Sequence, residues 1–234
     1  MSAVSSILQN NLFFPLLLTV GAYLGAVWLQ KKTGLALLNP ILVSVIVILP
    51  VVLLLGIPIE TYQEGTNVLS YLLTPATICL GLSLYEQLQK LKDDLSAILL
   101  GVLAGTIASA VAVLGICLLF RLDRQMIVTL LPKSVTTAIG AVLSEEAGGV
   151  TAITAAVIIL TGLLGNVLGD LLCRLCRIRD PIARGVAYGT ASHVVGTSKA
   201  IKESPLTGAV SSLSLAVSGL LTAVLFPIAV SFLK

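Results

Sequence analysis

A single histidine lies in an uncharged, glycine-rich stretch of the sequence. His193 is the chain's only histidine, and residues 185–198 around it contain no Asp, Glu, Lys or Arg. An ionisable side chain in so apolar a setting usually binds a substrate or carries a proton. We therefore predict substrate contacts from Thr190, Ser192, His193 and Thr197, with His193 as the proton-coupling candidate. The alternative is a neutral imidazole that bridges two helices through hydrogen bonds.

Two lysines accompany motifs that interrupt apolar segments. One motif is Pro132-Lys133-Ser134-Val135-Thr136-Thr137, and Lys199 follows the histidine motif. A cation beside a broken helix and its N-terminus favours an anion such as a carboxylate or phosphate. Either lysine can instead extend from a helix end to a membrane interface, and the hydroxyls can bond to carbonyls of their own helix. The predicted substrate ligands outside the histidine motif are Asn39, Lys133, Ser134, Thr136, Thr137 and Lys199.

The other reactive residue types give weaker signals. Asp170 lies four residues before Arg174, a spacing that favours an ion pair on one helix face. Cys173 and Cys176 have CxxC spacing without a second ligand pair, so we interpret them as packing or interface cysteines. No spaced set of ligands indicates a metal site, and no hydrolase, protease or nucleotide-binding motif is present. We predict no metal, no cofactor and no enzyme activity.

The composition places these residues in a membrane. Of 234 residues, 57% are hydrophobic and only 11% are charged, whereas soluble domains carry about 25% charged residues. No polar linker divides the chain, so we predict one polytopic membrane domain over residues 1–234. The net charge of +3 is small and its basic residues are scattered over short loops, which excludes a nucleic-acid surface. The apolar composition makes the lipid bilayer the expected surroundings.

Apolar segments of helical length recur along the chain. Aromatic residues are only 5% and no ten-residue alternation occurs, so the pattern favours helices over a barrel. We predict an all-α integral membrane protein with seven crossings and one re-entrant segment at 126–144, because that arrangement places most Lys and Arg on one side. Residues 1–124 and 125–234 are candidates for related halves with interrupted helices at the centre. The predicted segments are 12–30, 37–57, 67–86, 95–120, 126–144, 148–172, 183–201 and 206–233.

The interrupted motifs resemble those of the CidB/LrgB family. The resemblance rests on Leu38-Asn39-Pro40, Ser83-Leu84-Tyr85-Glu86-Gln87, the Pro132–Thr137 motif and Gly189-Thr190-Ala191-Ser192-His193 with Gly196-Thr197. It implies a holin/antiholin-like protein that influences murein hydrolase export and autolysis with a small CidA/LrgA-type membrane partner. Similar plastid proteins move glycolate and glycerate, and some bacterial systems are linked to pyruvate uptake. Ala138 and Ser83 stand where relatives often have proline, so we expect the helices there to be less sharply broken.

These observations lead to two functional hypotheses. The first is a carrier of a small monocarboxylate in the bacterial cytoplasmic membrane, with proton coupling through His193 as an option. The alternative is a holin/antiholin-like regulator that acts with its small membrane partner. Polarity is confined to short motifs rather than stripes along whole spans, which argues against a wide lytic pore. The expected partners are a small anionic metabolite, the LrgA/CidA-type protein and the bilayer, and a homo-oligomer is compatible with the sequence.

Overall fold

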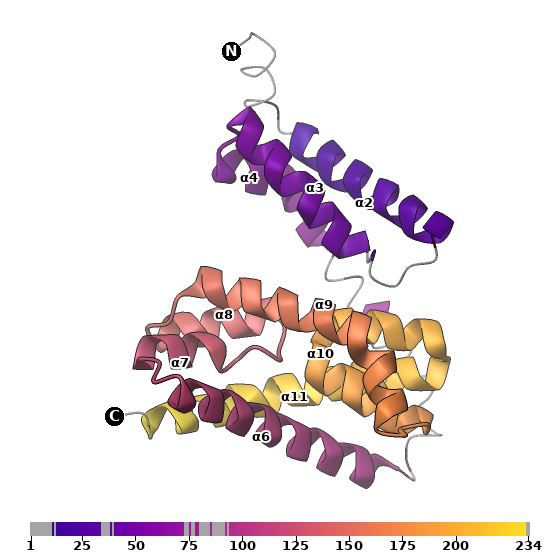
Figure 1. The fold of residues 1–234 in the computed structure, drawn as a ribbon, viewed down its shortest axis with the longest axis vertical. Coiled ribbons are helices and arrows are strands. Elements are labelled where there is room, and N and C mark those ends of the chain that lie inside the picture. Colours follow the sequence, from indigo (N-terminus) through magenta and orange to yellow (C-terminus); the bar gives the residue numbers. More distant parts are fainter. Residues whose placement is uncertain are drawn as a thin grey trace. The chain divides into compact units, whose positions relative to one another are not determined.

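The computed structural model describes residues 11, 13–33, 38, 40–72, 75, 78–79, 85, 92 and 94–232. These residues form nine helices, which confirms the predicted all-helical class (Figure 1). They belong to two compact units, unit 1 from Met1 to Cys79 and unit 2 from Leu80 to Lys234. Four of the helices are long and apolar enough to cross a bilayer, namely α2, α6, α9 and α11. The chain is therefore a multi-pass membrane protein.

Unit 1 contains three of the described helices. They are α2 (Phe13–Thr33), α3 (Pro40–Leu55) and α4 (Ile59–Tyr71). A hydrogen bond of 2.6 Å between the hydroxyls of Thr19 and Tyr62 joins α2 to α4. Asn39 and half of the residues in the predicted 67–86 segment lie outside the described residues.

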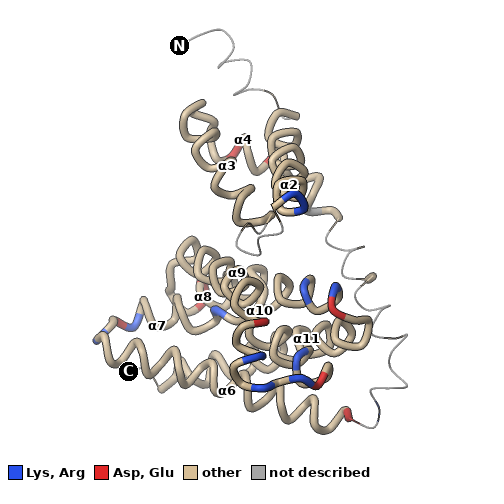
Figure 2. The backbone as a smooth tube through the Cα atoms, turned by 45° about the vertical axis from the view of Figure 1, so that its right-hand side comes forward, with Lys and Arg blue, Asp and Glu red and all other residues tan. Residues whose placement is uncertain are grey.

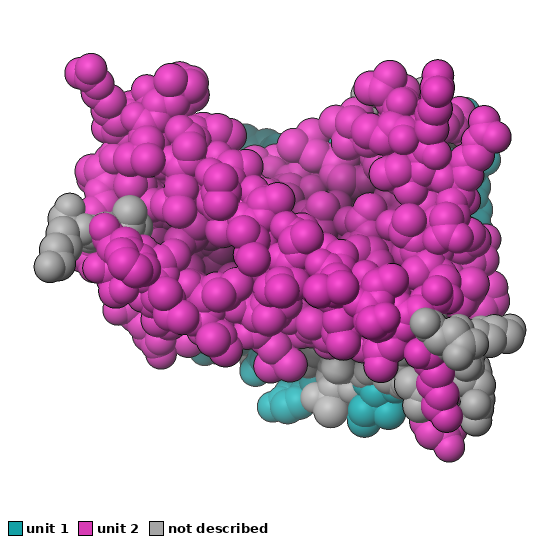
Figure 3. Space-filling model, turned by 90° about the horizontal axis from the view of Figure 1, so that it is seen from below, with its two compact units in different colours: residues 1–79 teal, residues 80–234 magenta. Residues whose placement is uncertain are grey.

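Three long helices frame unit 2. They are α6 (Leu95–Leu119), α9 (Thr151–Leu175) and α11 (Pro205–Ser231). With 25 residues in α6 and in α9, each is about 38 Å long, which exceeds a hydrocarbon core of roughly 30 Å. The space-filling view in Figure 3 shows a face of this unit that is hollowed between two lobes at its upper edge.

The segment between α6 and α9 folds back on itself. It contains α7 (Arg124–Leu130) and α8 (Thr137–Glu146), and the chain leaves the helical path between them. Pro132 lies in that interruption and has no amide hydrogen to continue a helix. The two ends meet, because the Gln125 side chain donates a 3.2 Å hydrogen bond to the carbonyl of Gly148. We call residues 124–148 the first hairpin, and its geometry agrees with the predicted re-entrant segment at 126–144.

A second segment also returns to the side from which it starts. Helix α10 (Pro181–Glu203) is broken at His193, whose φ of 41° and ψ of −134° are not helical. A straight helix of these 23 residues would separate its ends by about 33 Å. Instead, Arg184 near one end binds Glu203 at the other, at 2.8 Å. We call residues 181–203 the second hairpin, and the prediction that 183–201 crosses the membrane is wrong.

Because residues 181–203 fold back, the charged residues at both ends of this segment lie at the same end of unit 2. The second hairpin begins and ends beside the C-terminus of α9, where Arg184 binds Asp170 at 2.6 Å. That end of the unit carries most of the described basic residues, whereas only Arg121 and Arg124 lie where α6 leads into the first hairpin (Figure 2). The basic residues at the α9 end are Arg174, Arg177, Arg179, Arg184, Lys199 and Lys202.

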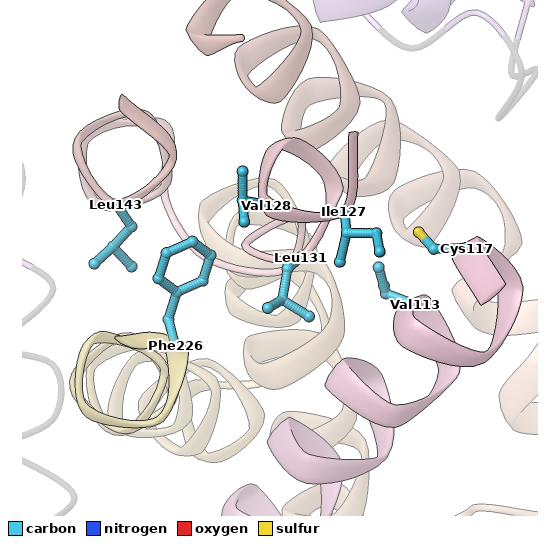
Figure 4. Packing of buried hydrophobic residues seen from close by; sticks show 7 residues of the cluster. All are labelled: Val113, Cys117, Ile127, Val128, Leu131, Leu143 and Phe226. Atoms are coloured by element: carbon cyan, nitrogen blue, oxygen red, sulfur yellow. The ribbon is translucent and has the colours of Figure 1, made fainter. Parts of the chain in front are cut away.

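The hydrophobic core of unit 2 holds the first hairpin against the long helices. Figure 4 shows side chains from α6, α7, α8 and α11 and the start of the interruption converging in one cluster. Their packing fixes the position of the hairpin's interruption between α6 and α11. The buried members are Val113, Cys117, Ile127, Val128, Leu131, Leu143 and Phe226.

Candidate functional site

Glycines on α9 let the second hairpin approach the centre of the unit. Gly162, Gly165 and Gly169 recur along one face of α9, opposite His193, Ser192 and Tyr188 respectively. A Cβ on Gly165 would overlap the Ser192 side chain, so only a glycine fits there. The GxxxG spacing of Gly165 and Gly169 therefore marks a close contact between α9 and the second hairpin.

Helix α6 packs against another side of the same hairpin through a second GxxxG pair. A Cβ on Gly101 would lie 3.3 Å from Val186 Cγ1, and one on Gly105 would lie 3.0 Å from Thr190 Cγ2. Close approach of the two backbones brings the Thr190 side chain next to α6. It also brings the tip region of the second hairpin near that of the first.

A small cavity lies where the two hairpins meet α6 and α11. Its volume is about 60 Å³, enough for several waters or a molecule of a few heavy atoms. The first hairpin contributes Ser134, and the second contributes Thr190. The Thr190 hydroxyl is buried and has no hydrogen-bond partner among the described residues. The polar side chains lining the cavity are Thr106, Ser109, Ser134, Thr190, Ser218 and Thr222.

Lys133 reaches the edge of this cavity through two hydroxyls. Its ammonium donates hydrogen bonds to Ser134 Oγ at 3.0 Å and to Ser109 Oγ at 3.3 Å. The two hydroxyls lie 2.9 Å apart and bind each other. Among the described residues, no carboxylate lies within ion-pair distance of Lys133. The geometry therefore leaves a cation and an unpartnered hydroxyl around one small space.

His193 lies at the turn of the second hairpin but is not among the residues that line the cavity. Its Nε2 lies 2.8 Å from the carbonyl oxygen of Ile158 on α9. A carbonyl can only accept, so Nε2 carries the hydrogen and donates. The neighbouring Thr197 hydroxyl donates to the His193 carbonyl and lies 2.9 Å from Ser211 Oγ on α11. Both residues thus fix the tip to the flanking helices.

Lys199 belongs to an ion-pair cluster at the base of the second hairpin. Its ammonium lies 2.8 Å from Asp170 Oδ2 and donates to the carbonyl of Asn166 at 2.7 Å. Asp170 also accepts from Arg184, which in turn binds Glu203. The predicted pair of Asp170 with Arg174 is therefore wrong: the return of the hairpin brings Arg184 and Lys199 to the carboxylate instead.

The remaining predicted ligands have structural positions around the hairpins. Thr136 is the N-cap residue of α8 and Thr137 begins that helix, with no side-chain cap bond from Thr136. Ser192 is buried against Gly165 of α9. The structure thus brings Ser134 and Thr190 to one cavity, sets Lys133 at its edge, and places Ser192, His193, Thr197 and Lys199 elsewhere in the second hairpin.

Several cavity residues were not predicted. Ser109 on α6 and Ser218 on α11 lie inside long apolar spans. Hydroxyls in such spans commonly bond to carbonyls of their own helix, as Thr106 does to Val102 at 2.8 Å. Only their position at the cavity between the two hairpins distinguishes them, and that position has no signal in sequence spacing.

Comparison with known proteins assigns the chain to a family. Residues 19–232 match the LrgB-like family. Holin-like protein CidB of Staphylococcus epidermidis is 37% identical over 91% of this chain and 93% of that protein, and its Staphylococcus aureus counterpart is 38% identical over the same shares. The Bacillus subtilis protein YwbG is 37% identical over 93% of this chain and 97% of its own length. No solved structure gives a significant match. The chain belongs to the LrgB-like family.

Proposed function

We propose that this protein carries a small monocarboxylate of the glycolate, glycerate or pyruvate type across the bacterial cytoplasmic membrane. The observation that supports this is the position of Lys133 beside a cavity at which two interrupted, folded-back segments meet. Broken helices that meet inside a bundle are the usual setting of substrate sites in secondary transporters. The site's small volume suits a molecule of a few heavy atoms.

The charge on the site favours an anion. An unpaired cation within a bilayer is costly, so intramembrane lysines usually bind a counter-charge or serve transport. Ser109 and Ser134 supply hydroxyl donors next to the Lys133 ammonium, and Thr190 supplies a hydroxyl without a partner. A carboxylate bound there would accept hydrogen bonds from all of these groups, and charge-assisted bonds of this kind are the strong ones.

The orientation follows from the basic residues. Lys and Arg accumulate in cytoplasmic loops, so we place the α9 end of unit 2, with Arg174, Arg177 and Arg179, on the cytoplasmic side. The second hairpin would then enter from the cytoplasm and the first hairpin from the opposite side. In this orientation the cavity would lie between two hairpins that enter from opposite sides, an arrangement suited to alternating access.

A second candidate function is a holin-like or antiholin-like component that controls murein hydrolase export and autolysis. The names of the staphylococcal relatives, both holin-like protein CidB, favour it more directly than they favour a carrier. In this role the protein would act with a small LrgA/CidA-type membrane protein, or as a homo-oligomer. The polar groups that line the cavity, however, lie between helices and are grouped around one small space.

The decisive experiment is uptake of radiolabelled glycolate, pyruvate and lactate into proteoliposomes that contain the purified protein alone. We expect saturable uptake of at least one of these by the natural protein. Lys133→Ala should lower it roughly 10- to 100-fold, because a hydrogen bond to a charged group contributes about 1.5–3 kcal/mol. Lys202→Ala is the matched control, because Lys202 is an exposed lysine outside the site.

The alternative outcomes separate the two candidates. Absence of uptake with all three acids, alone and with the small membrane partner added, would refute the carrier. Release of a large entrapped dye in the same vesicles would then support the holin-like role. Uptake that is unchanged in Lys133→Ala would keep a carrier but place its site elsewhere.

A further inference from the structure

The structure assigns proton coupling in this carrier to Lys133 rather than to His193. This inference rests on the proposed function and extends it to the ion that moves with the substrate. It states that Lys133 is neutral when the cavity is empty and becomes an ammonium ion when a carboxylate enters. Proton and anion then cross the membrane together.

The first support is the set of groups around Lys133. Its described contacts are the two hydroxyls of Ser109 and Ser134, which bind a neutral amine as well as an ammonium ion. The side chain is partly buried between elements and has no carboxylate within ion-pair distance in the described part of the chain. A buried cation without a counter-ion gives up its proton more readily than it remains charged.

The described charged groups on the neighbouring elements supply no counter-ion for Lys133. Helix α6 has no Asp, Glu, Lys or Arg between Leu95 and Leu119, and α11 has none between Pro205 and Ser231. The acidic and basic residues of α7, α8 and α9 are near the ends of those helices, and all but Arg124 and Asp170 lie within their last turn. They are Arg124, Glu145, Glu146, Asp170 and Arg174. In α10, Arg184, Lys199 and Glu203 belong to the ion-pair cluster with Asp170, and Lys202 is exposed. His193 would repel a Lys133 cation only if its imidazole were protonated.

The second support is that His193 is already engaged. Its Nε2 hydrogen is donated to the Ile158 carbonyl, and its ring packs against Gly162 of α9. It is not among the residues that line the cavity. Protonation of its other ring nitrogen would place a second cation near Lys133 without bringing it to the substrate. The imidazole is therefore suited to hold the tip of the second hairpin in place.

The cycle balances in protons and charge. On one side of the membrane, a proton from water converts the Lys133 amine to an ammonium ion as the carboxylate binds. Loading leaves the net charge of the site unchanged, because the proton brings one positive charge and the carboxylate brings one negative charge. On the other side, the carboxylate leaves and the ammonium ion returns its proton to water. The empty carrier then goes back with a neutral amine.

The first test uses Lys133→Arg, since a guanidinium binds a carboxylate but stays protonated. In proteoliposomes with radiolabelled glycolate, pyruvate or lactate, this variant should still exchange external for internal substrate, because exchange uses only the loaded carrier. Accumulation driven by an inward proton gradient should fall at least 10-fold relative to the natural protein. Lys202→Arg is the matched lysine-to-arginine control and should accumulate substrate normally.

The second test measures protons directly and does not depend on turnover. Adding the transported acid as its sodium salt to purified protein in weakly buffered detergent should cause uptake of one proton per bound molecule, read with a pH dye. Lys133→Arg should bind without proton uptake, and His193→Gln should retain proton uptake. Binding to the natural protein without proton uptake would overturn the inference.

The remaining outcomes are equally decisive. Proton-driven accumulation by Lys133→Arg at the natural level would overturn the assignment, and its loss in His193→Gln alone would return the role to histidine. If the natural protein takes up none of the three acids, the proposed function fails. If it takes them up independently of the proton gradient, the carrier stands and this inference alone fails.

Discussion

The two hairpins of unit 2 have similar paths but different chemistry at base and tip. The base of the first hairpin is closed by neutral groups: Thr154 Oγ1 lies 2.7 Å from Ser144 Oγ and 2.9 Å from the Thr129 carbonyl. The base of the second is closed by ions, with Arg184 between Asp170 and Glu203. At the tips the order is reversed, since the first carries Lys133 and the second carries an imidazole bound to a backbone carbonyl.

This contrast shows where each hairpin can respond to a ligand. Groups that are paired within the protein stabilise a fixed arrangement, whereas a lysine with hydroxyl partners alone can take up a proton and a new counter-charge. In the second hairpin, the ions described at the base and the imidazole at the tip already have partners within the protein. The Thr190 hydroxyl has none among the described residues. The first hairpin therefore carries Lys133, the group that can respond to a ligand. The second hairpin forms part of the cavity lining opposite it.

The largest expected effect tests whether packing on α9 holds the second hairpin. Gly165→Leu would force its side chain into Ser192 and should destabilise the protein by about 3 kcal/mol. Thermal unfolding in detergent would measure the loss. Gly115→Leu on α6 is the control, because a Cβ there meets none of the described atoms within 4 Å. Equal stability of the two variants would contradict the close contact between α9 and the second hairpin.

A smaller loss is expected at the base of the first hairpin. Thr154→Val removes a buried hydroxyl and leaves polar groups of Thr129 and Ser144 with fewer partners. Such a change costs about 1–3 kcal/mol, again measured by thermal unfolding. Valine has nearly the shape of threonine, so the substitution creates no large cavity that could itself lower the stability. An unchanged melting temperature would show that this base is held by apolar packing instead.

The ion pair at the base of the second hairpin should contribute less. The Arg184 and Glu203 side chains are about one-fifth exposed, at 21% and 23%, so solvent weakens the pair. A double-mutant cycle with Arg184→Gln and Glu203→Gln should give a coupling energy of about 1 kcal/mol. A coupling of zero would mean that the turn at His193 and the packing on α9 suffice to fold the hairpin back.

The smallest effect on stability is expected from Thr190→Val. This change has the same chemistry as Thr154→Val, but the Thr190 hydroxyl has no partner among the described residues. Removing it breaks no hydrogen bond among the described residues, so the free energy of unfolding should not fall. Carboxylate uptake should nevertheless fall, which proteoliposome assays would show. A clear loss of stability would indicate that the hydroxyl has a structural role.

The sequence predicts the helical fold and the interruptions, because Pro132, Gly189 and Gly196 weaken helices locally and are visible in one dimension. It does not predict that the second hairpin returns. The break occurs at His193, and the evidence for the return is a contact between Arg184 and Glu203 across the turn. Hydropathy treats such a segment as any other span, so it predicts a crossing at 183–201 where the structure has a hairpin.

The candidate site is predictable to a similar extent. Lys133, Ser134 and Thr190 are found from polarity within apolar segments, and the structure brings Ser134 and Thr190 to the cavity with Lys133 at its edge. Lys199 has the same local signal, yet its ammonium binds Asp170, a residue on another helix. Local sequence cannot separate a lysine that awaits a ligand from one that already has a partner. Only the tertiary contacts make that distinction.

The single-residue link between the second hairpin and α11 has a consequence for biosynthesis. Ser204 ends one element and caps the next, accepting a hydrogen bond from the Thr207 amide. The hairpin therefore emerges from the ribosome before the helix that covers it, with Gly189 facing Ser211 and Ser214 of α11. Its polar tip cannot settle in lipid alone. We therefore expect the second hairpin to reach its final packing only after α11 has also been inserted.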